Sequence, residues 1–384
     1  MNLIEKIKKF SASKMSIKPL KKVDVLIYDK SNVEIFAPYL KNLSHEILHN
    51  RMEKFNLLIL LKLLMKFKKI NMINYTFEFI NQCKPKIIIS FIDNNPSFYS
   101  IKNRFPEVKV IAIQNGMRSQ DLFVKFKSIK DLKADYIFTW GKAIQEKYQS
   151  SLSVKNLIIL GSFKNNLILR SEKKKRSSIA FISTGSEDNR YFYTIDEFTN
   201  KRDVPSKEFY KPEYILLPKI LDFCNRNNKK LEIIGREKQE ENRSQKEYEW
   251  YKKILGGNNF TFFEFGKKKS AYQISDEVEL CVNIYSAFGL EAIARGTRVS
   301  FFHLRQKVLS PTYHCFWPGK INLKGDFWTD DSSQDEVDRV LNYSLKTNDV
   351  DWNNSIKKII PNLITFDKDN KTFSDTIKKI LNKY

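Results

Sequence analysis

Apolar residues in the chain form short continuous runs that alternate with longer stretches of helical periodicity. In its first part these runs, rich in Val, Ile and Phe, lie at residues 23–29, 86–93, 108–116, 135–141 and 156–162. A run that is apolar throughout is typical of a strand buried on both faces of a parallel sheet. Because helical patterns such as residues 141–149 lie between the runs, we predict an α/β domain with a parallel sheet.

The alternation stops at a charged segment, residues 170–177, which has no apolar periodicity and is typical of a linker. Strand-like runs then resume at residues 178–184, 230–236, 259–265, 278–285 and 298–302. We therefore predict two doubly wound, Rossmann-like α/β domains, residues 1–169 and 178–384, joined by the basic linker 170–177. Ligands of such sheets lie at the carboxyl ends of the strands, so we expect the domains to face a substrate cleft.

One strand–turn–helix–strand stretch of the second domain, Asn283–Phe302, has a pattern suited to an anion. The helix is expected to begin near Phe288, just after Ser286. The first amides of a helix lack intrahelical partners and the macrodipole adds positive charge there, which suits a phosphate. Gly289 would let another backbone approach, and Glu291 could accept hydrogen bonds from two ribose hydroxyls. The alternative is that Ser286 only caps the helix and Glu291 is solvated.

The formal charge of +23 allows nucleic acid, an anionic membrane or anionic substrates as partners. The chain has no RNA-binding aromatic signature, zinc-finger spacing or helix-turn-helix pattern, so we do not expect nucleic acid as a partner. A bias toward AAA lysine codons is an alternative origin of the charge. The scattered cysteines favour free thiols in a reducing compartment. We expect no cofactor and no catalytic metal, because neither the histidines nor the acidic residues have metal-ligand spacing.

The N-terminus does not read as a signal peptide, because charges interrupt its apolar positions. The most hydrophobic stretch, Phe55–Lys69, is interrupted by Lys62 and is too short to span a bilayer. It predicts an amphipathic helix that is buried against a sheet; the alternative is a helix whose basic face rests on a membrane. We expect a cytoplasmic protein that is either free or peripheral at the inner face of the cytoplasmic membrane.

A series of motifs from Ile88 to Asp331 covers most of the chain. They are "IISFIDNNPSFYSIKNRFPEVKVIAIQNGMR", "ADYIFTWGK", "ILGSFKNN", "LEIIGRE", "YSAFGLEAIARGTRVSFF" and "GDFWTDD". In this order they resemble the GT-B glycosyltransferases and, more specifically, bacterial surface-carbohydrate biosynthesis proteins. Among these, the chain is similar to the retaining β-Kdo transferases, which use CMP-Kdo.

This resemblance implies a glycosyltransferase of surface polysaccharide biosynthesis. Its substrates would be a sugar nucleotide, bound on the second domain, and a glycan or lipid-linked acceptor, bound mainly on the first. The donor would be Kdo or a related acidic sugar carried by CMP, transferred with retention. Two alternatives stay open. One is another enzyme of the same shape, such as a UDP- or GDP-sugar-dependent transferase, an epimerase or a polyol-phosphate transferase. The other is a non-catalytic nucleotide-binding scaffold.

Polar residues follow two predicted strands of the first domain, in "FIDNN" and "IQNGMR". Because the carboxyl ends of strands face the cleft, we expect Asp93 and Gln114 to take part in catalysis. Asn94, Asn115 and Arg118 are expected to bind the acceptor. The alternative is turn formation, which Asn-rich segments favour.

The loop after the first strand of the second domain carries two acidic residues, Glu187 and Asp188. A retaining transfer that proceeds by two displacements needs a carboxylate at the anomeric carbon, and Asp188 is expected to supply it, with Glu187 as the substitute. The alternative is an acidic loop that caps the next helix. Arginines at such strand ends suit a phosphate or a sugar carboxylate. The residues expected to bind the donor are Ser286, Ala287, Gly289, Glu291, Arg236, Arg190 and His303.

Overall fold

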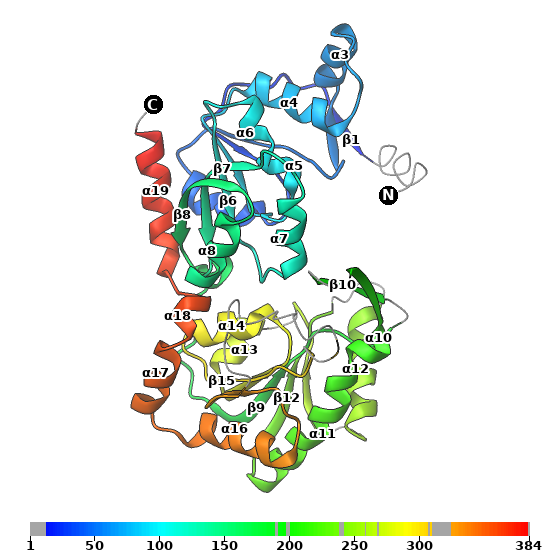
Figure 1. Ribbon diagram of the computed structural model, residues 1–384, viewed down its shortest axis with the longest axis vertical. Coiled ribbons are helices and arrows are strands. Elements are labelled where there is room, and N and C mark those ends of the chain that lie inside the picture. The colour runs from blue at the N-terminus through cyan, green and yellow to red at the C-terminus, as the bar shows by residue number, and fades with distance from the viewer. Residues whose placement is uncertain are drawn as a thin grey trace.

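The computed structural model contains two α/β domains, each built around a six-stranded parallel sheet (Figure 1). It describes residues 13–188, 191–196, 200–237, 242–257, 259–266, 269–305, 308 and 324–382. Within these ranges the fold class predicted from the sequence is confirmed: both domains are doubly wound and Rossmann-like.

The sheet of the first domain has the strand order β3-β2-β5-β6-β7-β8, in which every pair is parallel. Its strands are β2 (Val25–Ile27), β3 (His45–Ile47), β5 (Ile87–Ser90), β6 (Lys109–Ile113), β7 (Lys133–Thr139) and β8 (Ser153–Ile159). Its helices are α2 (Ala37–Leu40), α3 (Leu57–Met65), α4 (Met72–Cys83), α5 (Pro96–Tyr99), α6 (Ile101–Arg104), α7 (Gln120–Lys127), α8 (Lys142–Gln149) and α9 (Phe163–Leu167), with a 3-10 turn at Val33–Phe36. A small parallel pair, β1 (Lys14–Ser16) and β4 (Lys54–Asn56), lies beside the sheet.

The sheet of the second domain has the order β13-β12-β9-β14-β15-β16 and is also parallel throughout. Its strands are β9 (Arg176–Ile182), β12 (Lys230–Ile234), β13 (Thr261–Phe263), β14 (Val278–Asn283), β15 (Val299–Phe302) and β16 (Trp328–Thr329). Its helices are α10 (Ser206–Phe209), α11 (Lys211–Arg226), α12 (Arg243–Ile254), α13 (Ala271–Asp276), α14 (Ala287–Ala294), α16 (Gln334–Lys346), α17 (Asp349–Lys357) and α18 (Ile360–Leu363). An antiparallel hairpin, β10 (Tyr191–Asp196) and β11 (Asn200–Pro205), stands apart from this sheet.

Continuous apolar strands form because each sheet is covered on both faces. In β5, Ile88 belongs to one core cluster and its neighbours Ile87 and Ile89 belong to the cluster on the opposite face. In β9, Phe181 and Ala180 likewise belong to different clusters. Since successive strand residues point to opposite faces, burial on both faces demands an unbroken apolar run. The patterns read from the sequence arise from this arrangement.

The end of the chain differs from the expected domain boundary. A last helix, α19 (Lys371–Leu381), follows the 3-10 turn Lys368–Asn370 and packs on the first domain rather than the second (Figure 1). Phe373 of this helix lies in the same core cluster as Phe36 and Phe163. The sequence patterns of residues 178–384 identify the strands and helices of this region but not the sheet against which its last helix packs.

Close backbone contacts fasten this returning segment to the first domain. At Gly141 a Cβ atom would lie 2.5 Å from the Asn362 carbonyl oxygen. At Gly161, whose φ is +82°, a Cβ atom would lie 2.1 Å from the Thr365 oxygen. Glycine is therefore required at both positions, because any side chain would push the C-terminal segment away.

Candidate functional site

The carboxyl edge of the first sheet meets the second domain. Ser162, which follows β8, donates a hydrogen bond from Oγ to the Glu291 carboxylate of α14. Asn165 Nδ2 donates to the Glu291 carbonyl oxygen at 3.0 Å. Helix α7, which follows β6, contacts β10 of the second domain. The loops that carry the predicted site residues therefore lie at the junction of the two domains.

The turn between β14 and α14 has the geometry of a helix cap. Ser286 Oγ accepts a hydrogen bond from the Phe288 amide at 3.3 Å, and Ala287 is the first residue of the helix. The side chain of Asn283 accepts from the Ser286 amide at 3.0 Å and donates to the Ser286 carbonyl oxygen at 3.1 Å. A Cβ atom at Gly289 would lie 2.4 Å from Asn283 Nδ2. Gly289 is thus explained by the packing of Asn283, a buried residue of this chain, and not by the approach of a ligand.

Glu291 connects the two domains. Besides Ser162, the hydroxyl of Tyr272 donates to its carboxylate, at 3.0 Å to Oε2. Burial raises the pKa of Glu291 above its ordinary value, while the hydrogen bonds from Ser162 and Tyr272 oppose this shift. Each carboxylate oxygen has two lone pairs, so the two protein donors leave acceptor capacity for hydroxyls of a ligand.

The loop after β9 separates its two acidic residues. Glu187 is half-buried, and its Oε2 accepts a hydrogen bond from the Tyr214 hydroxyl at 2.8 Å. Asp188 is exposed, and its backbone amide donates to Ser206 Oγ at 2.9 Å. Arg190 lies outside the described residues. Of this pair of acids, Asp188 is the one that the fold leaves at the surface.

Arg236 and His303, two further predicted donor ligands, have partners within the domain. Arg236 is exposed, and its guanidinium donates to the Thr184 carbonyl oxygen, which links the ends of β12 and β9. His303 is buried; its amide donates to the Thr329 carbonyl oxygen at 2.8 Å and its ring stacks on Phe301. Both residues lie at strand ends, as expected.

A buried ion pair, Arg305 with Glu213, contacts the loop that follows β9. Arg305 Nη2 donates to Glu213 Oε1, and the Thr184 hydroxyl donates to the same oxygen at 3.0 Å. The guanidinium carbon of Arg305 lies 4.0 Å from the centre of the Phe209 ring. Nevertheless Arg305 Nε and Nη1 and Glu213 Oε2 have no hydrogen-bond partner among the residues that the structure describes. Buried donors of this kind are rare in folded proteins, so the pair is a candidate ligand contact.

Two buried carboxylates of this region, Glu213 and Glu247, were not predicted from the sequence. Glu213 lies within α11, and Glu247 within α12, where an acidic residue is ordinarily a solvated one. Glu247 accepts hydrogen bonds from the amides of Arg236 and Glu237, the latter at 2.8 Å, and from Ser183 Oγ. Burial raises the pKa of both Glu213 and Glu247. Apolar neighbours within their helices are the only sequence signal that could have suggested this burial.

In the first domain, Asp93 is fully buried and its carboxylate is hydrogen-bonded to other residues of the chain. Its carboxylate accepts from Arg118 Nε at 2.7 Å, from the Asn115 amide at 3.2 Å, and from the Tyr148 hydroxyl. Burial disfavours the charged form of Arg118, but Asp93 outweighs this and raises the pKa of the guanidinium. Because donors of the chain itself occupy the carboxylate oxygens of Asp93, the geometry favours a structural role for this residue over the catalytic role that we expected.

The side chain of Gln114 is also hydrogen-bonded within the first domain at both of its polar atoms. Its Oε1 accepts from the Trp140 amide at 2.8 Å and its Nε2 donates to the Gly116 carbonyl oxygen at 2.9 Å. The side chain is buried and ties the ends of β6 and β7 together. The geometry again favours positioning of the surrounding loop over contact with a substrate.

The predicted acceptor residues do come together. Asn94, which is exposed, and Arg118 line one cavity of about 490 Å³ between the loop after β5 and helix α7. The carbonyl oxygen of the Asn115 side chain accepts a hydrogen bond from Arg118. Ser119, Asp121, Lys125 and Ser128 complete its polar lining. This cavity lies on the helix that contacts β10 of the second domain.

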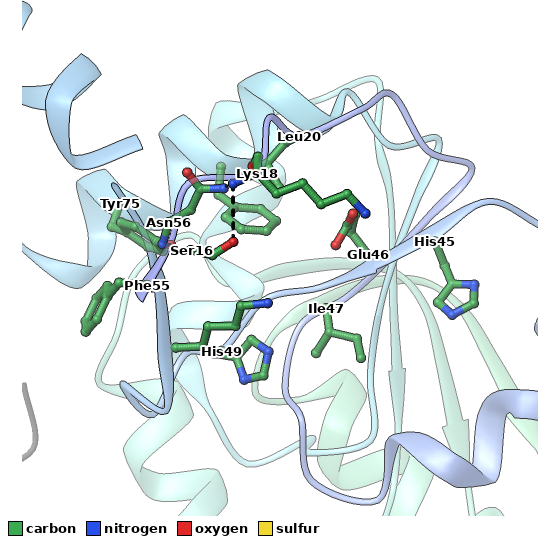
Figure 2. Close-up of a pocket in the computed structure, with 12 residues that line it drawn as sticks. Ser16, Lys18, Leu20, His45, Glu46, Ile47, His49, Phe55, Asn56 and Tyr75 are labelled. Carbon is green, nitrogen blue, oxygen red and sulfur yellow. Dashed lines mark hydrogen bonds between the residues drawn. The ribbon is translucent and has the colours of Figure 1, made fainter. Parts of the chain in front are cut away.

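A second cavity lies away from the strand ends, between the β1–β4 pair and the edge strand β3 (Figure 2). It has a volume of about 240 Å³. Its walls carry basic side chains, among them Lys18, His45 and His49, and apolar ones such as Phe55. None of the predicted site residues lines it.

Among the described residues, no cluster of His, Cys, Asp or Glu is arranged to hold a metal ion. In the same part of the chain, no helix has the length and apolarity needed to cross a membrane.

Several solved structures have the same fold. A structure described as a "putative UDP-N-acetylglucosamine 2-epimerase from Listeria monocytogenes" matches with a TM-score of 0.54 and 11% identity, over 94% of this chain and 98% of the other. The wall teichoic acid polymerase TagF, in its H444N form with CDPG, matches with a TM-score of 0.51 and 10% identity, over 96% and 90%. The UDP-GlcNAc 2-epimerase from Neisseria meningitidis bound to UDP-GlcNAc gives 0.50 and 10%, over 95% and 100%. Because the sequence identities are this low, the likeness shows the fold alone, which is the two-domain GT-B fold.

The sequence itself matches one protein family. None of the curated proteins matches the chain. A family described as "putative O-antigen biosynthesis protein" matches residues 111–381, which include the end of the first sheet and the whole second domain. The chain therefore belongs to this O-antigen biosynthesis family.

Proposed function

We propose that the protein is a glycosyltransferase that uses a sugar nucleotide to build a bacterial surface polysaccharide. The observation that carries the proposal is the turn at Ser286, where the capped end of α14 and the Glu291 carboxylate lie together at the domain junction. A helix end of this kind favours phosphate, and a carboxylate with spare lone pairs favours ribose hydroxyls. Membership of the O-antigen biosynthesis family supports carbohydrate chemistry.

The donor we propose is a CMP-linked acidic sugar, Kdo or a relative, transferred with retention. In the first step the Asp188 carboxylate would attack the anomeric carbon while the bond from that carbon to the CMP phosphate breaks. In the second step an acceptor hydroxyl would displace Asp188 and release its proton to water. The exposure of Asp188 supports its choice over Glu187, which is half-buried.

The acceptor is proposed to lie in the cavity lined by Asn94 and Arg118. An amide and a guanidinium in the cavity lining suit the hydroxyls and acidic groups of a glycan. Because Asp93 fixes Arg118 from behind, loss of Asp93 would disturb this cavity without removing a group that touches the substrate.

Thermal-shift measurements with CMP, CDP, UDP, GDP and their sugars test the donor class. A ligand at a hundredfold its dissociation constant adds about 2.7 kcal/mol to the stability, a readily measured shift. Glu291→Ala should weaken nucleotide binding by about 1–3 kcal/mol. Ser162→Ala is the matched control, because it removes the same interdomain hydrogen bond but keeps the carboxylate. Equal losses in both variants would mean that Glu291 acts only as a contact between domains.

Turnover with a bound donor tests the chemistry. Asp188→Asn should leave nucleotide binding intact and lower turnover about a hundredfold or more, on the order of 3 kcal/mol of barrier. Glu187→Gln should lower it less. Near-normal turnover by Asp188→Asn would remove the residue from the reaction.

A sugar-nucleotide epimerase is the second candidate, since epimerases of the same fold match the chain over nearly its full length. Product analysis separates the two reactions. A transferase releases the nucleotide and needs an acceptor, whereas an epimerase returns an isomeric sugar nucleotide without one.

A further inference from the structure

The outer end of the first domain carries a cluster of exposed apolar side chains. It comprises one face of α3, the segment that follows it and the start of α4, and α3 stands at the extremity of the molecule (Figure 1). We name these residues the apolar tip. They are Leu61 (54% exposed), Leu64 (55%), Met65 (78%), Phe67 (99%), Ile70 (51%) and Ile73 (57%).

The apolar tip arises because α3 carries apolar side chains on the side that faces the core and also on the side that faces away from it. Ile59 and Leu63, one turn apart, are buried in the core of the first domain. Leu61, Leu64 and Met65 lie on the other side of the helix, where the sequence had placed a polar or basic face. A helix that is apolar all round is ordinarily enclosed by protein or by lipid. Here the protein encloses only half of it.

Lys62 of α3 and Lys66, which directly follows the helix, do not cover its exposed side. Lys66 is paired with Glu78 of α4 at 2.8 Å, and Lys62 donates to Gln82 of the same helix. Both side chains therefore lie along the boundary between α3 and α4. Within the described chain the apolar tip is left without a polar cover, and an exposed apolar patch of this kind marks an interaction surface.

The charge around the tip identifies its partner. No Asp or Glu occurs between Lys54 and Phe77, whereas Lys68 and Lys69 are exposed within the tip itself. A second copy of the chain would bring lysines against lysines, which is unfavourable. An anionic bilayer offers both an apolar layer for the tip and phosphate groups for the lysines.

We propose that the apolar tip inserts into the interface of a membrane that contains anionic phospholipid. The side chains of Met65 and Phe67 would enter the boundary between headgroups and acyl chains. Lys68 and Lys69 would extend their charged ends to the phosphates while their methylene stems stay in the apolar layer. This surface lies on the first domain, to which the proposed function assigns the acceptor, but the proposal does not depend on that function.

Co-sedimentation of the full chain with phospholipid vesicles tests this. The vesicles contain either phosphatidylcholine alone or phosphatidylcholine with about a third of phosphatidylglycerol. The wild type should bind the anionic vesicles, and Met65→Gln/Phe67→Asn should bind at least about tenfold more weakly. The residues of this pair are largely exposed, so folding should be unaffected. Leu169→Gln/Val350→Gln is the matched control, because Leu169 (74%) and Val350 (70%) are equally exposed and lie elsewhere.

Charge and self-association provide two further readouts. Lys68→Glu/Lys69→Glu should weaken binding to anionic vesicles about thirtyfold or more, with no effect on the weak binding to neutral ones. The proposal is overturned if the wild type binds neither vesicle, or if the Met65/Phe67 variant and the control bind alike. It is also overturned if the wild type forms dimers in the absence of lipid and the Met65/Phe67 variant does not, because the tip would then be a contact between copies.

Discussion

Arg305 is 1% exposed, yet within the described part of the chain only one nitrogen of its guanidinium has hydrogen-bond partners. Its partner Glu213 is equally buried, and the described residues leave one of its oxygens unpaired. A buried ion pair of this kind contributes little net stability, but removal of one partner is costly because the other charge remains inside the protein. The effect of a substitution here is therefore governed by the charge that stays behind.

Arg305→Met should lower the free energy of unfolding by about 3–5 kcal/mol near neutral pH. Burial already raises the pKa of Glu213, with Arg305 opposing the shift, so loss of the cation should raise this pKa further. A carboxyl with a raised pKa in the folded state stabilises that state at low pH and loses this contribution as pH rises. The loss caused by Arg305→Met should thus be smaller at about pH 5 than at about pH 7.5, as measured by urea unfolding against the wild type.

Arg226→Met is the control for this experiment, because Arg226 pairs with Asp222 and Asp338 at the surface. It should cost less than about 1 kcal/mol. An Arg305→Met variant as stable as this control, or one whose loss is the same at both pH values, would contradict a buried and uncompensated Glu213.

At the scale of elements, α14 is positioned by its fit against the end of β14. Asn283, the last residue of the strand, is fully buried and holds the backbone of Ser286 at both its amide and its carbonyl. Gly289, in the first turn of the helix, leaves the space that the Asn283 side chain fills. The start of the helix, and with it the proposed phosphate site, is thus fixed by contacts that the pattern S-x-x-G-x-E only partly reveals.

Gly289→Ala should destabilise the protein by about 1–3 kcal/mol because the new methyl group would overlap the Asn283 side chain. In an open helix the same change would stabilise by up to about 1 kcal/mol, so the sign of the effect is diagnostic. Addition of Asn283→Ala to Gly289→Ala should cost less than Asn283→Ala costs alone, since the two residues share one space. At Gly116 the nearest atom would be 3.7 Å from an added Cβ, so Gly116→Ala is the neutral control. A stabilising Gly289→Ala, measured by urea unfolding, would contradict this packing.

At the scale of the whole molecule, the C-terminal segment of the described chain returns to the first domain. Helix α19 follows the second domain in sequence but completes the core of the first. The centroid of the Phe373 ring lies 4.9 Å from that of the Phe163 ring and 5.2 Å from that of the Phe138 ring. Part of the stability of the first domain is therefore supplied by the last residues of the described chain.

Phe373→Ala should cost about 3–5 kcal/mol, because it removes a large buried side chain from a core that cannot collapse around the cavity. Hydrogen exchange should accelerate in β5, β6 and β7 of the first sheet, although the substitution lies far from them in sequence. Val350→Ala, at an exposed position of α17, should change neither quantity. Acceleration confined to residues 371–381 would show that α19 only rests on the domain.

The sequence by itself determined the class of fold and the order of its strands along the chain. Burial on both faces of a sheet imposes continuous apolar runs, and this requirement is local enough to be visible in each segment. The same reasoning expected Asn94 and Arg118 to follow strands of the first sheet, and in the structure both line one cavity, while Ser286 caps α14. The short strands β1, β3 and β4 left no such pattern, because only one of the three residues in each is apolar.

Only the tertiary structure decided which polar groups are enclosed and which remain accessible. Asp93 and Asp188 both follow strands, yet one is surrounded by Arg118 and Tyr148 and the other is exposed. Glu291 and Ser162 are 129 residues apart and still share a hydrogen bond. Periodicity records whether a position is buried on average, but hydrogen bonds and ion pairs depend on what lies opposite in space. Contacts between distant segments therefore set the chemistry of the site, while local patterning sets the scaffold that carries it.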